Sequence, residues 1–413
     1  MKPLSCLTGA DASVARLRAA FDASPLSLTV GAEEELMLVD PGDGSLVGAI
    51  EDVLRHTGGD ARFQAEFRAA QVELVTRPCL SAADVGRELA TARLDLDDAI
   101  GPGLATMASG SHPTALRPGP LTRGERYRAV ARDNPWAARG MLTCGLHVHV
   151  GVEGAERALA VYNVARSYLP ELAALAANSP FHAGERTGAA STRMLLNRSL
   201  ARCGVPPAFP DWDAYADFAS WGRAGGAIPD TSYHWWDLRL HPGLGTLELR
   251  VCDVQTELED AVGLVALFQA LVAFLAERHD AGEALPVHDG YRIAESLWLA
   301  SHVGTRRELV DLDTGMRRPL ADRVAELLEA LAPTAEQLGT ERELIRVARL
   351  AAACGADRQQ QIAADIGLEA LPLRLAAETV ASARRLRTRA DVNGDRGSRA
   401  ERALRMRAVA TSA

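Results

Sequence analysis

Two glutamates in the segment GAEEELMLVD have a spacing that suits cation binding. Glu33 and Glu35 are two residues apart in an apolar stretch rich in strand formers. A β-strand would place both on one face, about 6.6 Å apart at a rise of ~3.3 Å per residue, with Glu34 on the other face. Such carboxylates repel each other and are costly to desolvate unless a cation lies between them. Taken alone, the pattern favours an edge strand with a solvated acidic face.

Two other segments alternate polar and apolar residues in the same way. Glu73 stands between two apolar residues, with Glu66 seven positions earlier, and the segment GLHVHV puts His147 and His149 on one face. A lone glutamate in a strand usually faces solvent, and a core histidine is commonly satisfied by its neighbours. Same-face histidines on a glycine-flanked strand also suit a metal ion or a phosphate.

A fourth segment, LELR, points Glu248 and Arg250 to the same side of an expected strand. This pair alone could be a cross-strand ion pair. A single shared cation site, however, explains why four segments of an otherwise apolar protein each carry polar residues on one face. Ligation by five glutamates and one histidine indicates Mg²⁺ or Mn²⁺ rather than zinc, and several such ions would neutralise a polyphosphate.

The composition excludes several classes of enzyme. Lys2 is the only lysine among the 45 basic residues, so a P-loop, a protein kinase and a pyridoxal enzyme are ruled out. The formal net charge of -9 gives no reason to expect nucleic acid or a membrane as partner. Residues 381–413 hold nine arginines against three acidic residues but no aromatic residue for base stacking, which favours a solvated tail.

The cysteines and the apolar segments indicate a cytoplasmic protein. The six cysteines include no Cys-x-x-Cys pair, which fits reduced thiols. The N-terminus lacks the apolar core of a signal peptide. The longest apolar stretch, 261–276, is shorter than the ~20 residues of a membrane span, and we expect it to form a buried helix.

Periodicity predicts the elements that must position these side chains. The segment 178–234 is rich in glycine and proline and predicts a long ordered loop region. Strands are predicted at 28–40, 69–76, 142–152 and 244–255. Helices are predicted at 12–23, 81–100 with Ser81 as N-cap, 155–177 with an interruption at Pro170, 258–278, and through most of 292–386.

Taken together, these motifs resemble one known family. The residues that carry the resemblance are Gly-x-Glu-x-Glu (31–35), Gln-Val-Glu-Leu-x-Thr (71–76), Gly-Leu-His-Val-His-Val-Gly (145–151), Asn-Ser-Pro-Phe (178–181), Trp-Trp-Asp-x-Arg (235–239) and Thr-Leu-Glu-Leu-Arg-Val-Cys-Asp (246–253). They are similar, in consistent order over about 28–385, to the type 2 glutamate-cysteine ligases, also called carboxylate-amine ligases.

The resemblance implies an α+β fold of the glutamine synthetase type. We expect a curved, largely antiparallel sheet that carries the active site and is backed by helices, with a helical C-terminal part. One catalytic domain would span 1–386, with a sheet-rich part at 28–255 and a mainly helical part at 256–386. Residues 387–413 would form a basic, flexible tail.

The resemblance also implies roles for individual residues. Glu33, Glu73 and Glu248 are expected as metal ligands, and Glu35, Glu66 and His147 would complete two or three magnesium or manganese sites. The catalytic and nucleotide-binding groups expected to face the transferring phosphate are His149 and Arg250. Arg239, also a catalytic candidate, and Arg193 would hold the substrate carboxylate and phosphate oxygens.

The implied activity is ATP-dependent ligation of a carboxylate, such as glutamate, to an amine, such as cysteine, through an acyl phosphate, with release of ADP and phosphate. The partners would be an amino acid, an amine and ATP. Whether the protein forms a homo-oligomer is left open by the sequence. Alternatives are a phosphotransferase on the same scaffold and a catalytically silent binding protein. Two positions depart from the family pattern. Arg186 stands where an acid is common, which would favour a more acidic substrate or repel a cationic amine. A glutamine of the segment Gly-Ala-Asp-Arg-Gln-Gln (355–360) stands where an arginine is common.

Overall fold

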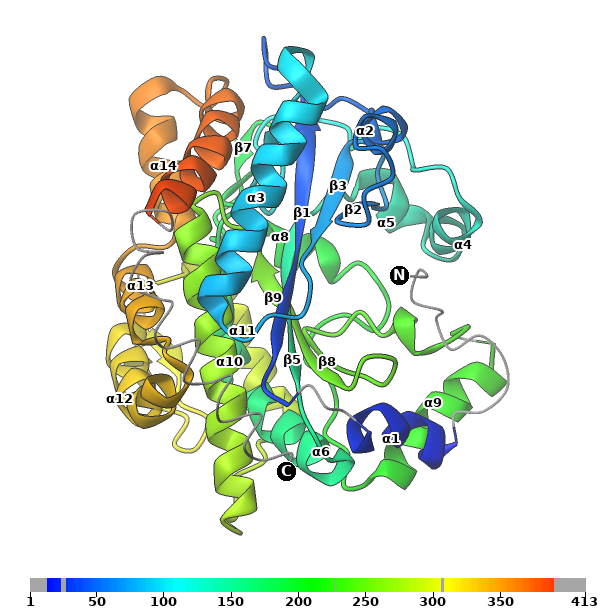
Figure 1. The fold of residues 1–413 in the computed structure, drawn as a ribbon, viewed down its shortest axis with the longest axis vertical. Helices are drawn as coiled ribbons and strands as arrows, with labels where there is room; N and C mark the ends of the chain where they lie inside the picture. The colour runs from blue at the N-terminus through cyan, green and yellow to red at the C-terminus, as the bar shows by residue number, and fades with distance from the viewer. Residues whose placement is uncertain (1–12, 24–26, 227, 306–307, 390–413) are drawn as a thin grey trace, which may run out of the picture.

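The computed structural model describes residues 13–23, 27–226, 228–305 and 308–389. Helices pack around an antiparallel sheet of seven strands (Figure 1). The strand order is β2-β3-β1-β5-β9-β8, with β4 also paired to β1. Every pairing in this sheet is antiparallel, as predicted. The strands are β1 (Val30–Val39), β2 (Phe63–Ala65), β3 (Gln71–Val75), β4 (Ala105–Met107), β5 (Gly145–Gly151), β8 (Leu238–His241) and β9 (Thr246–Asp253).

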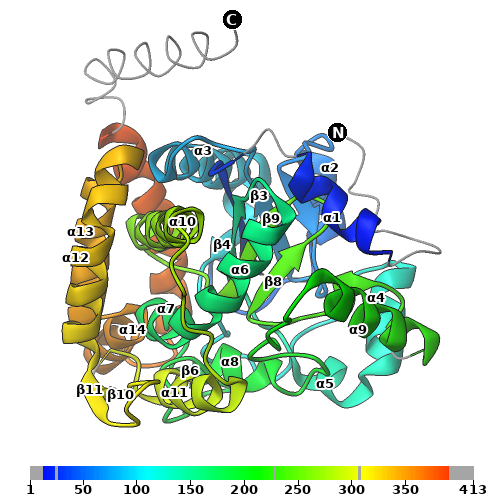
Figure 2. The same cartoon turned by 90° about the horizontal axis from the view of Figure 1, so that it is seen from below.

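Three helices cover one face of the sheet: α3 (Ala82–Ile100), α6 (Ala155–Ala165) and α10 (Leu258–Asp280). They contact β1, β8 and β5 respectively (Figures 1 and 2). The apolar positions of the strands, such as Val148 and Leu249, are buried against them. Because strand side chains alternate, the polar positions point to the opposite face. There α4 (Glu125–Asp133) and α8 (Thr192–Asn197) contribute to the walls of a cavity.

The remaining described elements pack around this sheet. The C-terminal third is mainly helical, and a helix at 371–389 runs past the expected domain boundary at 386. The rest of the predicted tail, 390–413, lies outside the described residues. The other elements are α1 (Val14–Asp22), α2 (Ile50–His56), η1 (Gly101–Gly103), α5 (Pro135–Gly140), η2 (Arg166–Tyr168), α7 (Leu169–Ala176), β6 (Phe181–His182), β7 (Glu185–Arg186), α9 (Trp212–Ala224), η3 (Thr231–Tyr233), α11 (Gly290–Val303), β10 (Glu308–Val310), β11 (Arg317–Pro319), α12 (Leu320–Leu338), α13 (Glu341–Ala352) and α14 (Gly355–Ile366).

Two predicted segments were partly wrong. The expected loop region 178–234 contains helices α8 and α9. Helix α9 forms because Asp211 accepts a capping hydrogen bond from the Ala214 amide at 2.8 Å, and Trp212 and Tyr215 are buried on one side. In 292–386, which was expected to be mostly helical, the hairpin β10–β11 interrupts the helices.

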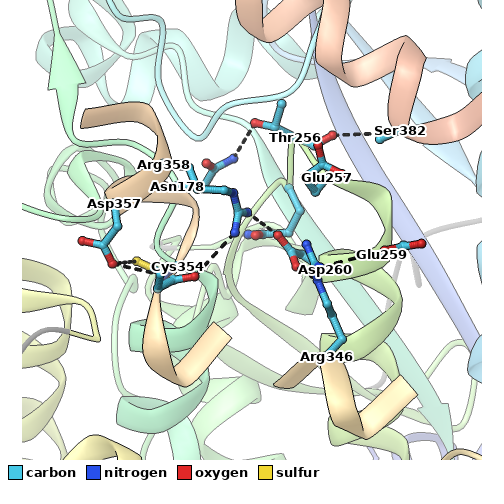
Figure 3. A network of polar contacts seen from close by, with 12 residues as sticks. Asn178, Thr256, Glu257, Glu259, Asp260, Arg346, Cys354, Asp357, Arg358 and Ser382 are labelled. Atoms are coloured by element: carbon cyan, nitrogen blue, oxygen red, sulfur yellow. Dashed lines mark hydrogen bonds and ion pairs between the residues drawn. The ribbon is translucent and has the colours of Figure 1, made fainter. Parts of the chain in front are cut away.

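Helix α10 is the expected buried helix. By length and composition alone it could cross a membrane, since an 18-residue window has a mean hydropathy of 1.9, but 89% of that window is buried inside the protein. Its first turn is fixed by Asp260, which is fully buried and pairs with Arg346 of α13 and Arg358 of α14 (Figure 3). Just before α10, the Thr256 carbonyl accepts a hydrogen bond from Ser382 at 3.1 Å. The C-terminal helices are therefore joined to the connection that follows β9.

The face of β1 turned away from the cavity contains a buried ion pair. Arg93 of α3 donates two hydrogen bonds of 2.8 Å to Glu34, and both side chains are fully buried. The same guanidinium reaches the carbonyls of Gln255 at 2.8 Å and Thr379 at 3.3 Å. One bidentate pair thus connects β1, α3, the β9–α10 connection and the C-terminal helix.

We expect Arg93→Ala to reduce the free energy of unfolding by ~3–5 kcal/mol, because it leaves the Glu34 carboxylate buried without a partner. Chemical denaturation measures this loss. Arg87→Ala, at an exposed position of the same helix, should change stability by less than ~0.5 kcal/mol. Equal losses for the two variants would contradict a special role for the buried pair.

Candidate active site

A cavity of about 410 Å³ lies on the polar face of the sheet. Every site residue predicted from the sequence lines it: Glu33, Glu35, Glu66, Glu73, His147, His149, Arg193, Arg239, Glu248 and Arg250. Segments more than 200 residues apart in the chain thus meet at one place.

Sheet register brings the acidic residues together. Glu35 stands opposite Glu73 across β1 and β3, and Glu33 stands opposite His147 across β1 and β5. Directly paired residues share a face, so all four point into the cavity. His147 Nδ1 lies 3.1 Å from a Glu33 oxygen, and the Gly145 amide donates to Glu35 at 2.5 Å.

The neighbouring part of the cavity combines a carboxylate with two arginines. Glu248 of β9 stands opposite both His149 of β5 and Arg239 of β8. Arg239 Nε donates to Glu248 at 2.7 Å, and Arg250 donates to the other oxygen of the same carboxylate. His149 Nε2 lies 3.3 Å from Glu33 and 3.9 Å from Glu248, so this histidine joins the two halves of the site.

A β-bulge lies in β9 at Arg250. Leu146 pairs with Cys252 and Val148 pairs with Leu249, so β9 has one residue more than β5 between these pairs. Arg250 and its neighbour therefore both stand opposite a single residue of β5. Bulges of this kind are common next to functional sites.

Arg193 has a different environment from the other two arginines. It lies on α8, is buried, and donates to the backbone carbonyls of Arg250 at 2.9 Å and Val251 at 3.1 Å. A side chain on Gly145 would collide with this guanidinium. Two of the nitrogens of Arg193 are therefore engaged by β9 itself.

The carboxylates at the β1–β3 side compete for protons. Burial raises the pKa of Glu73 well above its ordinary value, and the charges of Glu33, Glu66 and Glu35 raise it further. Burial and the Glu35 charge together raise the pKa of Glu66 to about 8. Without a cation, this side of the cavity therefore holds protons at neutral pH.

The carboxylates nearer the basic groups stay ionised. Burial alone would raise the pKa of Glu33, but His149 and His147 hold it well below its ordinary value. Likewise, burial opposes ionisation of Glu248, yet Arg239 and Arg250 keep its pKa well below the usual range. Proximity to a guanidinium or an imidazolium outweighs desolvation at both positions.

Two groups of side chains have the spacing of metal ligands, with their ligand atoms within 4.8 Å of one another. One consists of Glu33, Glu73 and His147, and the other of Glu33, His149 and Glu248. Carboxylate oxygens predominate in both, which fits Mg²⁺ or Mn²⁺. The raised pKa values of Glu73 and Glu66 support the fit, since a divalent cation could replace the protons that these groups retain.

Several residues of the cavity wall were given no individual role from the sequence, although Trp235 and Asp237 belong to the motif at 235–239. Asp237 lies two positions before Arg239, a spacing that could have placed both side chains on one face. Arg126 and Tyr127 lie on α4, far from every motif, and no local pattern marks them. The unpredicted lining residues include Gln64, Arg126, Tyr127, Trp235, Asp237 and His241.

Arg186, one of the two departures from the family pattern, contacts the segment 355–360 that contains the other. Arg186 is exposed on the hairpin β6–β7 and donates to Gln360 of α14 at 2.6 Å. It is not among the residues that line the cavity. The expectation that Arg186 selects or repels a substrate directly is therefore not supported by its position.

The raised pKa of Glu66 predicts a pH-dependent stability in the presence of EDTA. Between its ordinary value of 4.5 and about 8, the folded protein keeps a proton that the unfolded chain has lost. The free energy of unfolding should therefore fall as pH rises through this range, by up to about 1.4 kcal/mol per pH unit. Chemical denaturation across the range should show a smaller slope for Glu66→Gln, whereas the exposed control Glu369→Gln should keep the wild-type slope. An unchanged slope in Glu66→Gln would contradict the assignment.

Two solved structures have a similar fold. A glutamate–cysteine ligase from Francisella tularensis in complex with AMP has a TM-score of 0.60 at 14% identity, with 88% of this chain and 92% of that chain covered. A bifunctional glutathione synthetase from Pasteurella multocida also gives 0.60, at 15% identity, over 86% of this chain and 52% of that chain.

Sequence comparison extends the similarity to closer relatives. A protein provisionally named glutamate–cysteine ligase 2-1 from Rubrobacter xylanophilus is 37% identical over 339 residues, which cover 81% of this chain and 90% of the relative. One provisionally named glutamate–cysteine ligase 2 from Jannaschia sp. is 35% identical over 81% of this chain and 89% of its own. The family "glutamate-cysteine ligase family 2" matches residues 29–379. The chain with this cavity therefore belongs to glutamate-cysteine ligase family 2, a family of ATP-dependent ligases.

Proposed function

We propose that the protein joins a carboxylate, glutamate or a similar amino acid, to an amine, cysteine or another amino compound, at the expense of ATP. The carboxylate is activated as an acyl phosphate, and ADP and phosphate are released. The observation that carries the proposal is the cavity in which two oxygen-rich ligand groups share Glu33 beside Arg239 and Arg250. Glutamate and cysteine are proposed as substrates because the names of the relatives contain them.

The chemistry requires activation because a carboxylate is a poor electrophile. Phosphorylation converts one oxygen into a leaving group, and the amine then attacks the acyl carbon. Phosphoryl transfer depends chiefly on positioning and charge neutralisation. Arginines and divalent cations can provide both, so the absence of a suitable lysine is no obstacle.

The residues divide into ligands and phosphate-facing groups. Glu33, Glu73 and Glu248 would hold Mg²⁺ or Mn²⁺, together with Glu35, Glu66 and His147. Bound cations would supply neutralisation of the ATP phosphates. His149 and Arg250 would contact the transferring phosphoryl group, and Arg239 and Arg193 would orient substrate oxygens. Both guanidinium groups already have protein partners. Arg193 binds two β9 carbonyls, and Arg239 binds Glu248 and the carbonyls of Ser232 and His234.

We also propose that the sheet is the curved sheet of the glutamine synthetase type and that 1–386 is one catalytic domain. The buried pairs that join β1 and α10 to the C-terminal helices support a single unit. The cytoplasm is the proposed compartment, since the five cysteines within the described residues are all unpaired.

Arg250→Lys should lower kcat at saturating ATP by about tenfold or more, because an ammonium group cannot bind Glu248 and a phosphate oxygen with the geometry of a planar guanidinium. The control Arg77→Lys changes an exposed arginine and should leave kcat unaltered. A kcat close to wild type would reduce Arg250 to an ion-pair partner of Glu248.

The proposed reaction is tested by incubating the protein with Mg-ATP and amino acids, singly and in pairs, and measuring ADP. We expect turnover to require a pair and to stop in excess EDTA. Hydroxylamine should replace the amine and trap the acyl phosphate as a hydroxamate. With carboxyl-¹⁸O substrate, one label should appear in the released phosphate.

Other outcomes would identify a different reaction. AMP and pyrophosphate as products, or phosphate without ¹⁸O, would contradict acyl phosphate chemistry. ADP formed from a single substrate, with a stable phosphorylated product, would indicate a phosphotransferase. No turnover with any pair would favour a binding protein.

A further inference from the structure

The side of the cavity formed by β8 contains a carboxylate oxygen that has no hydrogen-bond donor in the described part of the chain. Asp237 immediately precedes β8, and its backbone carbonyl accepts a hydrogen bond from the Arg250 amide at 2.8 Å. Its side chain lines the same cavity as the predicted metal ligands. The Oδ2 atom is buried and has no hydrogen-bond partner among the described residues.

Three positive groups lie close enough to Asp237 to affect its pKa, and two of them, Arg250 and Arg193, are engaged elsewhere. Arg198, Arg193 and Arg250 each lower its pKa, against a larger increase caused by burial. None of them forms an ion pair with it within the described part of the chain. Arg250 pairs with Glu248, and Arg193 donates to the carbonyls of β9.

A buried carboxylate oxygen without a hydrogen-bond donor is energetically costly. A divalent cation does not fit this place, because Asp237 belongs to neither ligand group and arginines surround it. A group with N–H donors and a single positive charge can satisfy the orphaned oxygen and is repelled less by these arginines than a divalent cation would be. A substrate ammonium group has these properties.

We propose that Asp237 binds the ammonium group of the amine substrate, accepts one proton from it and orients the free amine, which attacks the acyl carbon as phosphate leaves. This assignment rests on the proposed ligase function. Asp237 is the cross-strand neighbour of Arg250, at a strand spacing of ~4.8 Å. An amine held by Asp237 would therefore lie beside the place where Arg250 would contact the phosphoryl group, and within reach of the acyl carbon.

The test compares a charged amine with an uncharged one in Asp237→Asn. Cysteine presents an ammonium group near neutral pH, whereas hydroxylamine is largely uncharged there and is small enough to attack without the carboxylate. Asp237→Asn keeps the shape and removes the charge. We expect KM for cysteine, or for whichever amine the paired assay selects, to rise ~10–100-fold, which is the value of a charged hydrogen bond. KM for ATP and the rate of hydroxamate formation should stay within about twofold of wild type.

Two controls complete the experiment. Asp217→Asn removes the same charge from an exposed position of α9 and should change neither amine reaction. Asp237→Glu keeps the charge and should recover part of the lost amine affinity, which a merely structural role would not explain.

The outcomes separate this assignment from the function on which it rests. Unchanged KM for the amine in Asp237→Asn, or an equal loss of hydroxamate formation, would overturn the role of Asp237 and leave the ligase intact. A wild-type protein that forms neither amide nor hydroxamate with any carboxylic acid would remove the ligase function, and this assignment with it.

Discussion

Mutual repulsion among carboxylates governs the organisation of the site. Antiparallel pairing of β1 with β3 and β5 forces Glu33, Glu35 and Glu73 onto one face, and Glu66 joins them from the end of β2. Burial is the larger cause of the raised pKa values of Glu66 and Glu73, and the repulsion between the carboxylates raises them further. The histidine and arginine side chains of β5, β8 and β9 offset the charge at one side only. The opposite side is left with an excess of oxygen ligands, which is the physical basis for expecting divalent cations there.

A buried ion pair on the opposite face of β1 holds the strand in place despite the repulsion between its cavity glutamates. Glu34, between the two cavity glutamates, forms the buried pair with Arg93, and that guanidinium also binds the β9–α10 connection and the C-terminal helix. In the first turn of α10, Asp260 pairs with Arg346 of α13 and Arg358 of α14. The helices behind the sheet are thus attached to the same strand that presents the ligands. The stability of the fold and the geometry of the site therefore both depend on β1, whose side chains alternate between the two faces of the sheet.

Much of this site could be predicted because strand alternation is a local property. The faces of β1, β3, β5 and β9 follow from the sequence alone, and with them Glu33, Glu35, His147 and Glu248. The pairing of these strands is a long-range property, so the bulge beside Arg250 was not predictable. Arg193 was chosen for its charge, although the carbonyls that engage it belong to a strand 57 and 58 residues away. Helix α9 was missed because proline and glycine counts obscured its Asp211 cap. Asp237 was given no role although its spacing from Arg239 could have placed both side chains on one face.

The position of Glu33 has a consequence for how cations would associate with the site. Both ligand groups include this carboxylate, so neither can be filled or altered independently of the other. An ion held by one of its oxygens withdraws electron density from the second, while the same ion relieves the repulsion that disfavours ionised neighbours. Occupancy of the two positions is therefore thermodynamically linked, and a cation titration would follow a coupled isotherm rather than the sum of two independent ones.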